Sequence, residues 1–244
     1  MRQACDSSSH PLTSECVGRL RSCDPAWYEA VRKLVTLTSR GVLEPKVTEL
    51  VQLAIHASVT GLNTQEIRRH VRGALQNDAS WEEILAVFKL CSVIGIHAMA
   101  VASPILAKSL EQSGKTMDPA DAGETPMINA LRARERFNPA WTTIEKWDPA
   151  WLDCFLAVGL HPDIERVLGE RTLELLYIAI DATVTHLYCP GTQRHIDFAL
   201  SIGVHAHEIL EVLKLVSIQG LRSIEAGIGI LDEEFEARKA DLRT

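Results

Sequence analysis

The chain has 244 residues, 46% of them apolar and 23% charged, so it is long enough to bury a core as one large domain or two small ones. A formal net charge of −7 without a basic cluster argues against nucleic acid and anionic membranes as partners. The absence of a long apolar run, of a signal-peptide pattern in MRQACDSSSHPLTSEC and of any CxxC pair among six cysteines predicts a soluble, cytoplasmic protein.

The first clear helices are predicted from residue 46 onward. Apolar side chains recur at helical spacing over 46–60. Asn63 followed by Glu66 is a capping pair that starts a second helix, and Ser80 with Glu83 starts a third. Gly95 follows, where that helix ends or packs closely against a neighbour. No stretch shows the alternation of a strand, which favours an all-α fold.

The same pattern returns 125 residues later in the chain. TELVQLAIHASVTGLNTQEIRRHVRGAL begins at Thr48 and LELLYIAIDATVTHLYCPGTQRHIDFAL at Leu173. The match is gap-free from 49/174 to 106/231, with about 22 identities. DPAW also occurs twice, at 24–27 and 148–151. In the second copy Pro190 suits the first turn of a helix, where its missing N–H costs nothing. We call the two copies the first unit and the second unit.

The repeat predicts a division of the chain into four parts. Residues 1–22 are expected to be a flexible segment, 23–111 a first helical repeat and 141–244 a second repeat with a C-terminal tail. Residues 112–140, which contain EQSGKTMDPADAGETPM, are rich in Gly, Pro and acidic residues and are expected to be a linker. Each repeat is predicted to be a bundle of about five helices.

The order of an upstream glutamate, HVRGALQNDASWEEILAVF (70–88) and a helix ending near a glycine resembles the carboxymuconolactone decarboxylase / alkylhydroperoxidase-D-like family. The resemblance implies an all-helical fold and assembly into rings. It also implies one of two activities: a redox activity that uses a CxxC pair, or decarboxylation of a carboxylated lactone without metal or organic cofactor. By position, the family glutamate falls at Glu49 and Glu174 and the family histidine at His70 and His195.

Two departures from the family pattern bear on function. The glutamate and histidine lie 21 residues apart in both units, about two more than the family pattern, so the loop between the helices is longer. The CxxC pair is absent from both units, which counts against peroxidase activity. Cys189 corresponds to Thr64 in the first unit, as expected of a helix cap or small pocket residue.

The candidate catalytic residues are therefore Glu174, His195, Glu49 and His70. A histidine held by a carboxylate can take or give a proton near neutral pH. The alternative is that each pair is a structural contact, because a buried glutamate needs a partner. The candidate substrate-binding residues are Arg194, Tyr188, His186, Arg69, Cys189 and His97. Arginine suits a substrate carboxylate, although a surface ion pair is an equally good interpretation.

A metal site remains an alternative to cofactor-free chemistry. His186, Cys189 and His195, with His205 and His207, have the ligand types that zinc accepts. The first unit has Gly61 and Thr64 at the first two of these positions, so we expect no metal.

Three functions follow from the sequence. We expect a cofactor-independent decarboxylase-like lyase acting on a small carboxylated lactone or keto acid. The alternatives are a thiol-dependent peroxidase or disulfide reductase and a non-catalytic binding or assembly protein. If single-unit relatives form six-membered rings, this two-unit chain should form a homotrimer with pseudo-hexameric symmetry.

Overall fold

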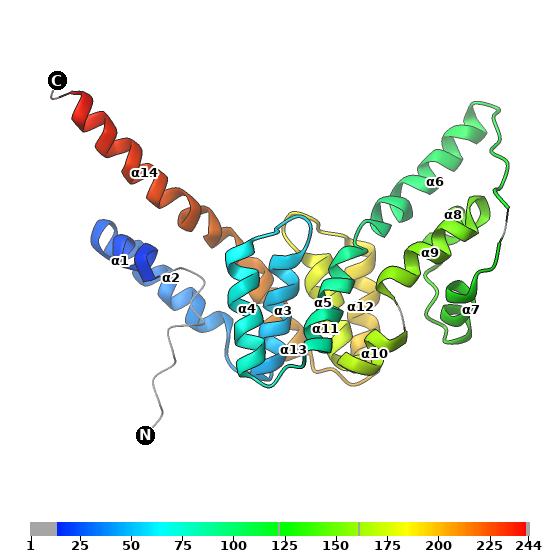
Figure 1. The fold of residues 1–244 in the computed structure, drawn as a ribbon, viewed down its shortest axis with the longest axis horizontal. Coiled ribbons are helices and arrows are strands. Elements are labelled where there is room, and N and C mark those ends of the chain that lie inside the picture. The colour runs from blue at the N-terminus through cyan, green and yellow to red at the C-terminus, as the bar shows by residue number, and fades with distance from the viewer. Residues whose placement is uncertain (1–13, 122, 161, 243–244) are drawn as a thin grey trace.

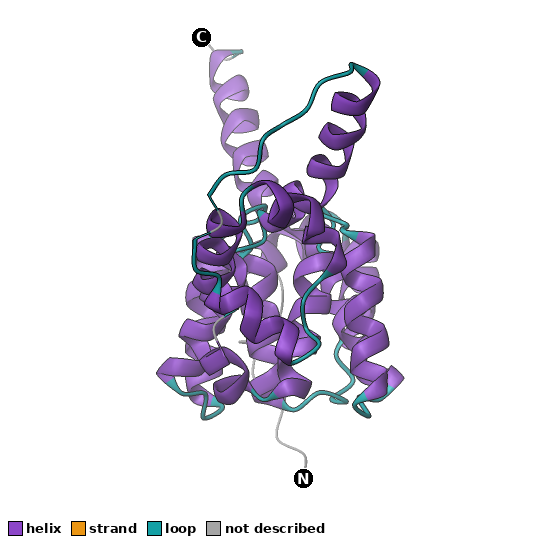
Figure 2. Ribbon diagram, turned by 90° about the vertical axis from the view of Figure 1, so that its right-hand side faces the viewer, coloured by secondary structure: helices purple, strands orange, loops and turns teal. Residues whose placement is uncertain are grey.

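The computed structural model describes residues 14–121, 123–160 and 162–242, and within these ranges it contains helices and no strand (Figures 1 and 2). This confirms the predicted all-α class. The elements in chain order are α1 (Ser14–Cys23), α2 (Pro25–Thr38), α3 (Pro45–Ala57), α4 (Thr64–Gln76), α5 (Trp81–Ser92), α6 (Ile96–Gln112), α7 (Pro126–Ala133), the short 3-10 helix η2 (Pro139–Trp141), α8 (Thr142–Trp147), α9 (Pro149–Gly159), α10 (Pro162–Leu168), α11 (Glu170–Ala182), α12 (Cys189–Ser201), α13 (Ala206–Ser217), η3 (Ile218–Leu221) and α14 (Arg222–Asp241).

The core is a set of helices drawn equally from both units (Figure 1). α3 packs against α4 and α5, and α11 packs against α12 and α13 in the same way. α3 and α11 also contact each other, so one apolar core runs through both units. Val51 on α3 and Leu176 on α11 are fully buried in it.

Helix starts follow the local sequence signals. The Asn63 side chain accepts a hydrogen bond from the Glu66 backbone N–H at the start of α4. Ser80 and Glu83 form a capping box on α5. Pro190 lies in the first turn of α12. These three predicted features are confirmed, and two of them fix α4 and α12, the helices that carry His70 and His195.

The last helix of each unit crosses to the other unit. α6 leaves the core on one side and contacts η2 and α8, which belong to the second half of the chain. α14 leaves on the opposite side and contacts α1 (Figure 1). Side chains at the start of α6 and α14 therefore lie beside the unit to which they do not belong.

Two segments are more ordered than the sequence suggested. Residues 14–22 of the expected flexible segment form most of α1, whose Cys16 and Leu20 pack with Val31; residues 1–13 lie outside the described residues. The expected linker, 112–140, contains α7, whose apolar face packs with Leu152 and Leu156 of α9. Short apolar runs that bury against a neighbour explain both differences.

One stretch is long and apolar enough to cross a membrane by composition, the region Trp81–Gln112 that includes α5 and α6. Half of its most apolar window is buried inside the protein. α5 in particular packs on α3, α9 and α10. Its apolar character is accounted for by that packing, because the core helix of a soluble protein has the same composition.

Candidate active site

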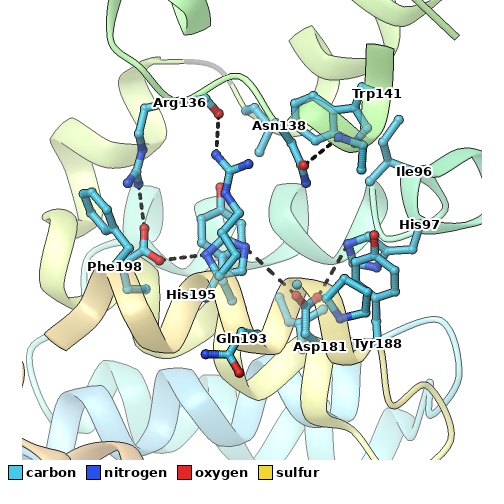
Figure 3. A pocket seen from close by; sticks show the side chains of 18 of the residues that line it. Ile96, His97, Arg136, Asn138, Trp141, Asp181, Tyr188, Gln193, His195 and Phe198 are labelled. Carbon is cyan, nitrogen blue, oxygen red and sulfur yellow. Dashed lines mark hydrogen bonds and ion pairs between the residues drawn. The ribbon is translucent and has the colours of Figure 1, made fainter. Parts of the chain in front are cut away.

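Glu174 and His195 meet in the second unit, and Figure 3 shows His195 among the side chains around it. Glu174 lies on α11 and its side chain is 0% exposed, while His195 lies on α12. His195 Nδ1 is 2.7 Å from Glu174 Oε2. A carboxylate oxygen accepts hydrogen bonds, so Nδ1 carries a proton and Nε2 is left to take or give one. The Tyr177 ring stacks on the imidazole with centroids 4.4 Å apart and fixes its plane.

Arg136 holds the other oxygen of Glu174. Its Nη2 donates to Oε1 at 2.6 Å, and its guanidinium lies 4.0 Å from the Phe198 ring centroid. The Arg136 carbonyl in turn accepts a hydrogen bond from Arg194 Nη2 at 2.8 Å. Both oxygens of the buried carboxylate therefore have a donor, as a buried charge requires.

Asp181 lies across from His195, about two helical turns beyond Glu174 on α11. Its Oδ2 is 4.0 Å from His195 Nε2 and has no hydrogen-bond partner among the described residues. Burial, together with the charge of Glu174, raises the pKa of Asp181 to about 8. Gly191 is needed here, because a Cβ at that position would collide with Asp181 Oδ2 and the Tyr188 ring.

His97 reaches the same site from α6, across the boundary between the units. Its Nε2 is 3.6 Å from Asp181 Oδ1, and its Nδ1 is 2.7 Å from His186 Nε2. The Tyr188 ring stacks on it with centroids 3.8 Å apart. Burial, and then the neighbouring His186 and His195, lower the pKa of His97 to about 3, so it is neutral at physiological pH.

These groups line a cavity of about 840 Å³. This volume is in the range that holds a small organic molecule. Its walls combine apolar side chains such as Ile94, Trp141 and Phe198 with the polar groups described above. The arrangement supplies a base or acid at His195 Nε2 and a cation at Arg194, both in the lining of one cavity.

The predicted substrate-binding residues divide into two groups. Arg194, Tyr188 and His97 line the cavity. His186 stands behind His97 and bonds to it. Cys189 does not line the cavity: it is exposed at the start of α12, with its thiol 3.6 Å from the Leu187 carbonyl. The substrate-binding role expected for Cys189 is therefore corrected, because the turn into α12 directs its side chain to solvent.

The first unit repeats the central pair, but among the described residues no cavity of comparable volume lies beside it. His70 Nδ1 lies 2.8 Å from Glu49 Oε2. Beyond it, Glu66 Oε2 is 3.4 Å from His70 Nε2 and forms ion pairs with Arg69 and Arg222. The space lined by Arg69 and Arg222 has a volume of only about 10 Å³. The predicted candidates Glu49, His70 and Arg69 therefore lie in a filled site.

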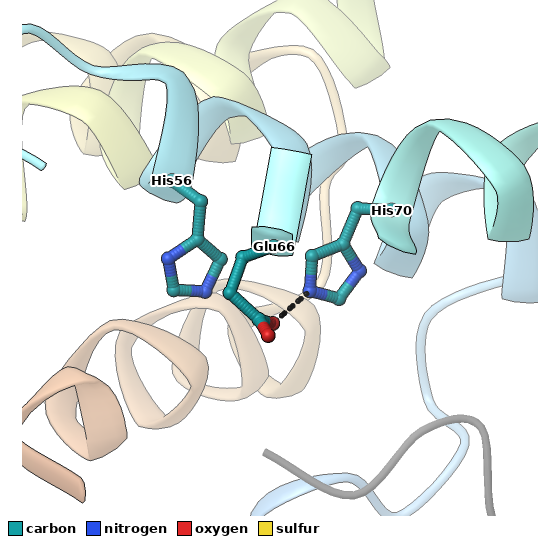
Figure 4. A group of neighbouring side chains, drawn as sticks. All are labelled: His56, Glu66 and His70. Atoms are coloured by element: carbon teal, nitrogen blue, oxygen red, sulfur yellow. Dashed lines mark ion pairs between the residues drawn. The ribbon is translucent and has the colours of Figure 1, made fainter. Parts of the chain in front are cut away.

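Positions related by the 125-residue offset explain the difference between the units. The first unit has His56 where the second has Asp181, and His56 stacks on His70 with ring centroids 5.5 Å apart (Figure 4). Glu66 corresponds to Gly191, so a carboxylate occupies space that is open in the second unit. Arg222, from the start of α14, corresponds to His97, from the start of α6.

Sequence reasoning missed the parts of the site that come from distant elements. Arg136, Asn138 and Trp141 line the cavity from the segment expected to be a linker or its border. No periodicity or motif marked them, since their role depends on how the segment folds back onto α11 and α12. The sequence signal for Asp181 was its position as a charged residue on an otherwise apolar helix.

Comparison with known proteins agrees with the fold. The model of the carboxymuconolactone decarboxylase family matches residues 25–107. A crystal structure from Burkholderia xenovorans LB400, provisionally named a gamma-carboxymuconolactone decarboxylase subunit, is 31% identical and superposes with a TM-score of 0.82. The match covers 94% of each chain. Among curated proteins, no match was found.

Proposed function

Because the chain belongs to the carboxymuconolactone decarboxylase family, we propose that it is a carboxy-lyase that acts on a small carboxylated lactone or keto acid in the cavity of the second unit. The observation that supports this proposal is the orientation of His195. Its Nδ1 is committed to Glu174, so its Nε2 faces the cavity as the proton-transfer atom.

The chemistry requires an electron sink and a proton. When CO2 leaves a keto acid or a lactone acid, the electron pair of the broken C–C bond moves to the carbonyl oxygen as an enolate. The carbon then takes a proton from the protonated Nε2 of His195, and water returns a proton to the ring. Glu174 stabilises the imidazolium while it exists, and Arg136 keeps that carboxylate in place.

Arg194 is the proposed site for the substrate carboxylate. It lines the cavity beside His195, and one of its N–H groups bonds to the Arg136 carbonyl. A guanidinium has five N–H donors, so others remain for a carboxylate. The Tyr188 hydroxyl is a second polar group in the lining. Apolar walls around them keep water scarce, which strengthens each of these interactions.

We assign this activity to the second unit alone. The equivalent volume in the first unit is filled by Glu66 and Arg222, so its Glu49–His70 pair has no substrate to act on. The first unit then serves as a structural partner that supplies His97. We also propose that the protein is soluble and acts in the cytoplasm.

A panel of carboxylated lactones and β-keto acids, assayed by CO2 release, tests the proposal. His195→Gln should reduce turnover of an accepted substrate about 10²–10⁴-fold, the usual contribution of a general acid–base group. The same substitution in the first unit, His70→Gln, should retain most of the turnover. Equal losses in both variants would contradict assignment to the second unit, and no loss with His195→Gln would contradict the proposal itself.

The two alternative functions give different outcomes. A thiol peroxidase would lose peroxide turnover in Cys189→Ser, whereas the absence of a CxxC partner for Cys189 predicts no change. For a binding or assembly protein, Glu174→Gln and His195→Gln would leave every detected activity unchanged. The proposed lyase predicts that both lose CO2 release together.

A further inference from the structure

Asp181 is a buried acid that the proton transfer described above does not use. Its side chain is 3% exposed, and its Oδ2 faces the cavity without a hydrogen-bond partner among the described residues. Burying such an oxygen without a partner costs free energy. Gly191 packs directly against this oxygen, since a Cβ there would collide with it. A ligand from solution would give this oxygen the partner that the described residues do not provide.

The groups around Asp181 are of the kind that bind transition metals. His97, Asp181 and His186 each offer a ligand atom, and these atoms lie within 4.8 Å of one another. His97 Nε2 is 3.6 Å from Asp181 Oδ1 (Figure 3). Metal–ligand bonds of about 2.0–2.2 Å place two ligands of one ion about 3–4 Å apart, so this pair needs little movement to share an ion.

The kinds of ligand atom at this place also point to a class of metal ion. A histidine binds a metal ion through the lone pair of the neutral ring. Two nitrogen ligands and one carboxylate favour zinc and its first-row neighbours over magnesium or calcium, which prefer oxygen.

In the first unit, side chains of the protein provide the positive charge at the corresponding place. There the carboxylate of Glu66 pairs with the guanidinium groups of Arg69 and Arg222. At the position of Arg222 the second unit has His97, an imidazole in place of a fixed positive charge. The carboxylate opposite it is that of Asp181, which corresponds to His56 and not to Glu66.

The first unit has its own group of ligand types, His56, Glu66 and His70, whose atoms also lie within 4.8 Å of one another. The guanidinium of Arg222 is ion-paired with that glutamate and would repel a metal ion. Burial, with the charge of Arg222 and His70, lowers the pKa of His56 to about 3, as expected beside a cation. The group in the first unit therefore serves as a control for the group in the second unit and is not itself a candidate metal site.

We propose that His97, Asp181 and His186 bind one divalent first-row metal ion, of the zinc type, in the wall of the cavity. The ion would lie beside His195 with its open positions toward the cavity, where an oxygen of an anionic substrate can reach it. This departs from the expectation of no metal drawn from the sequence. It does not depend on which reaction the cavity performs.

The test is metal binding by the full chain, without substrate. The protein is stripped with a chelator and titrated with Co²⁺, whose visible absorption reports its ligands, and bound metal is counted by elemental analysis after gel filtration. We expect one Co²⁺ per chain, displaced by Zn²⁺. Asp181→Asn and His97→Gln should each weaken binding more than about tenfold. His56→Gln in the first unit, and His207→Gln on the surface, should bind like the parent protein.

Each outcome decides the proposal. Failure of the stripped protein to bind Co²⁺ or Zn²⁺ would overturn it, as would an ion retained by both Asp181→Asn and His97→Gln. Circular dichroism checks that the variants are folded, and His186→Gln replaces any that is not. As a second measurement, Zn²⁺ should raise the melting temperature of the parent and of His56→Gln but not of the ligand variants. Loss of decarboxylase activity plays no part in the result, so the two proposals fail separately.

Discussion

His97 and Asp181 come from different halves of the chain, yet His97 Nε2 lies 3.6 Å from Asp181 Oδ1. The reciprocal contact exists on the other side of the core, where Arg222 of α14 pairs with Glu66 of α4. The crossing of α6 and α14 produces both contacts. Each unit thus completes the polar centre of the other, and the difference between a histidine and an arginine at these positions accompanies the difference between an open and a filled site.

Arg136→Met should lower both stability and turnover. The substitution leaves the fully buried Glu174 with His195 as its remaining partner, and breaking a buried pair on one side costs about 3–5 kcal/mol. Arg136→Lys keeps the charge and should recover part of the loss. Urea unfolding midpoints and CO2 release measure the two effects. If Arg136→Met unfolds like the parent protein, the contact with Glu174 does not stabilise the fold.

Gly191→Ala should disturb the cavity. The new Cβ would collide with Asp181 Oδ2 and the Tyr188 ring, and such overpacking costs about 1–3 kcal/mol. Turnover should fall because both side chains shift. Gly227→Ala on α14 is the matched control, since a Cβ there meets nothing within 4 Å. Equal thermal stability and turnover in the two variants would contradict close packing at Gly191.

Glu66 should make the fold sensitive to acid. Burial alone would raise its pKa, but hydrogen bonds with His70 and Arg222 and the charges of Arg69 and Arg222 outweigh it and lower the pKa to about 2. A lowered pKa means that the unfolded chain takes up the proton first, near pH 4.5. The stabilisation is therefore complete above that pH and is lost as the pH falls toward about 2.

Glu66→Gln should thus be less stable than the parent protein at neutral pH, and the difference should shrink as the pH falls through this window. Urea unfolding followed from about pH 7 to about pH 3 measures it. The control is Glu236→Gln, which removes an exposed ion pair with Lys239 and should change stability by less than about 1 kcal/mol. A constant difference across the window would exclude Glu66 as the acid-sensitive group.

The chain should be a homotrimer. Ile105 and Leu106 on α6 are exposed, and so are Ile230 and Leu231 at the corresponding positions of α14. Matching apolar positions on the two crossing helices suit a ring in which each chain supplies two similar faces. Light scattering should give three times the chain mass, and Ile105→Glu with Ile230→Glu should dissociate it. Ser109→Glu adds one negative charge at an exposed site on α6 and should leave the trimer intact. A monomeric parent protein at micromolar concentration would contradict the ring.

Local signals in the sequence predicted what depends on local structure. The capping side chains of Asn63 and Ser80 and the position of Pro190 fixed helix starts, and the fixed spacing of glutamate and histidine brought Glu174 to His195 as expected. These contacts join helices that follow each other in the chain, so the spacing of residues in the sequence is enough to predict them.

Contacts between distant elements were not predictable in this way. Arg136 reaches Glu174 from a segment without helical periodicity, and His97 reaches Asp181 because α6 crosses between the units. A sequence pattern shows which face of a helix will be buried, but it does not show which other helix will pack against that face. The distinction between an open and a filled site therefore required the structure.

The crossing of α6 also limits how this protein can be divided or recombined. A fragment that begins at residue 141 would carry Glu174, His195 and Asp181 but would lack both His97 and Arg136. A fragment that ends before residue 222 would leave Glu66 without one of its two guanidinium partners. The two halves are consequently not interchangeable modules. A change in either half can remove a contact that the other half needs to complete its polar centre.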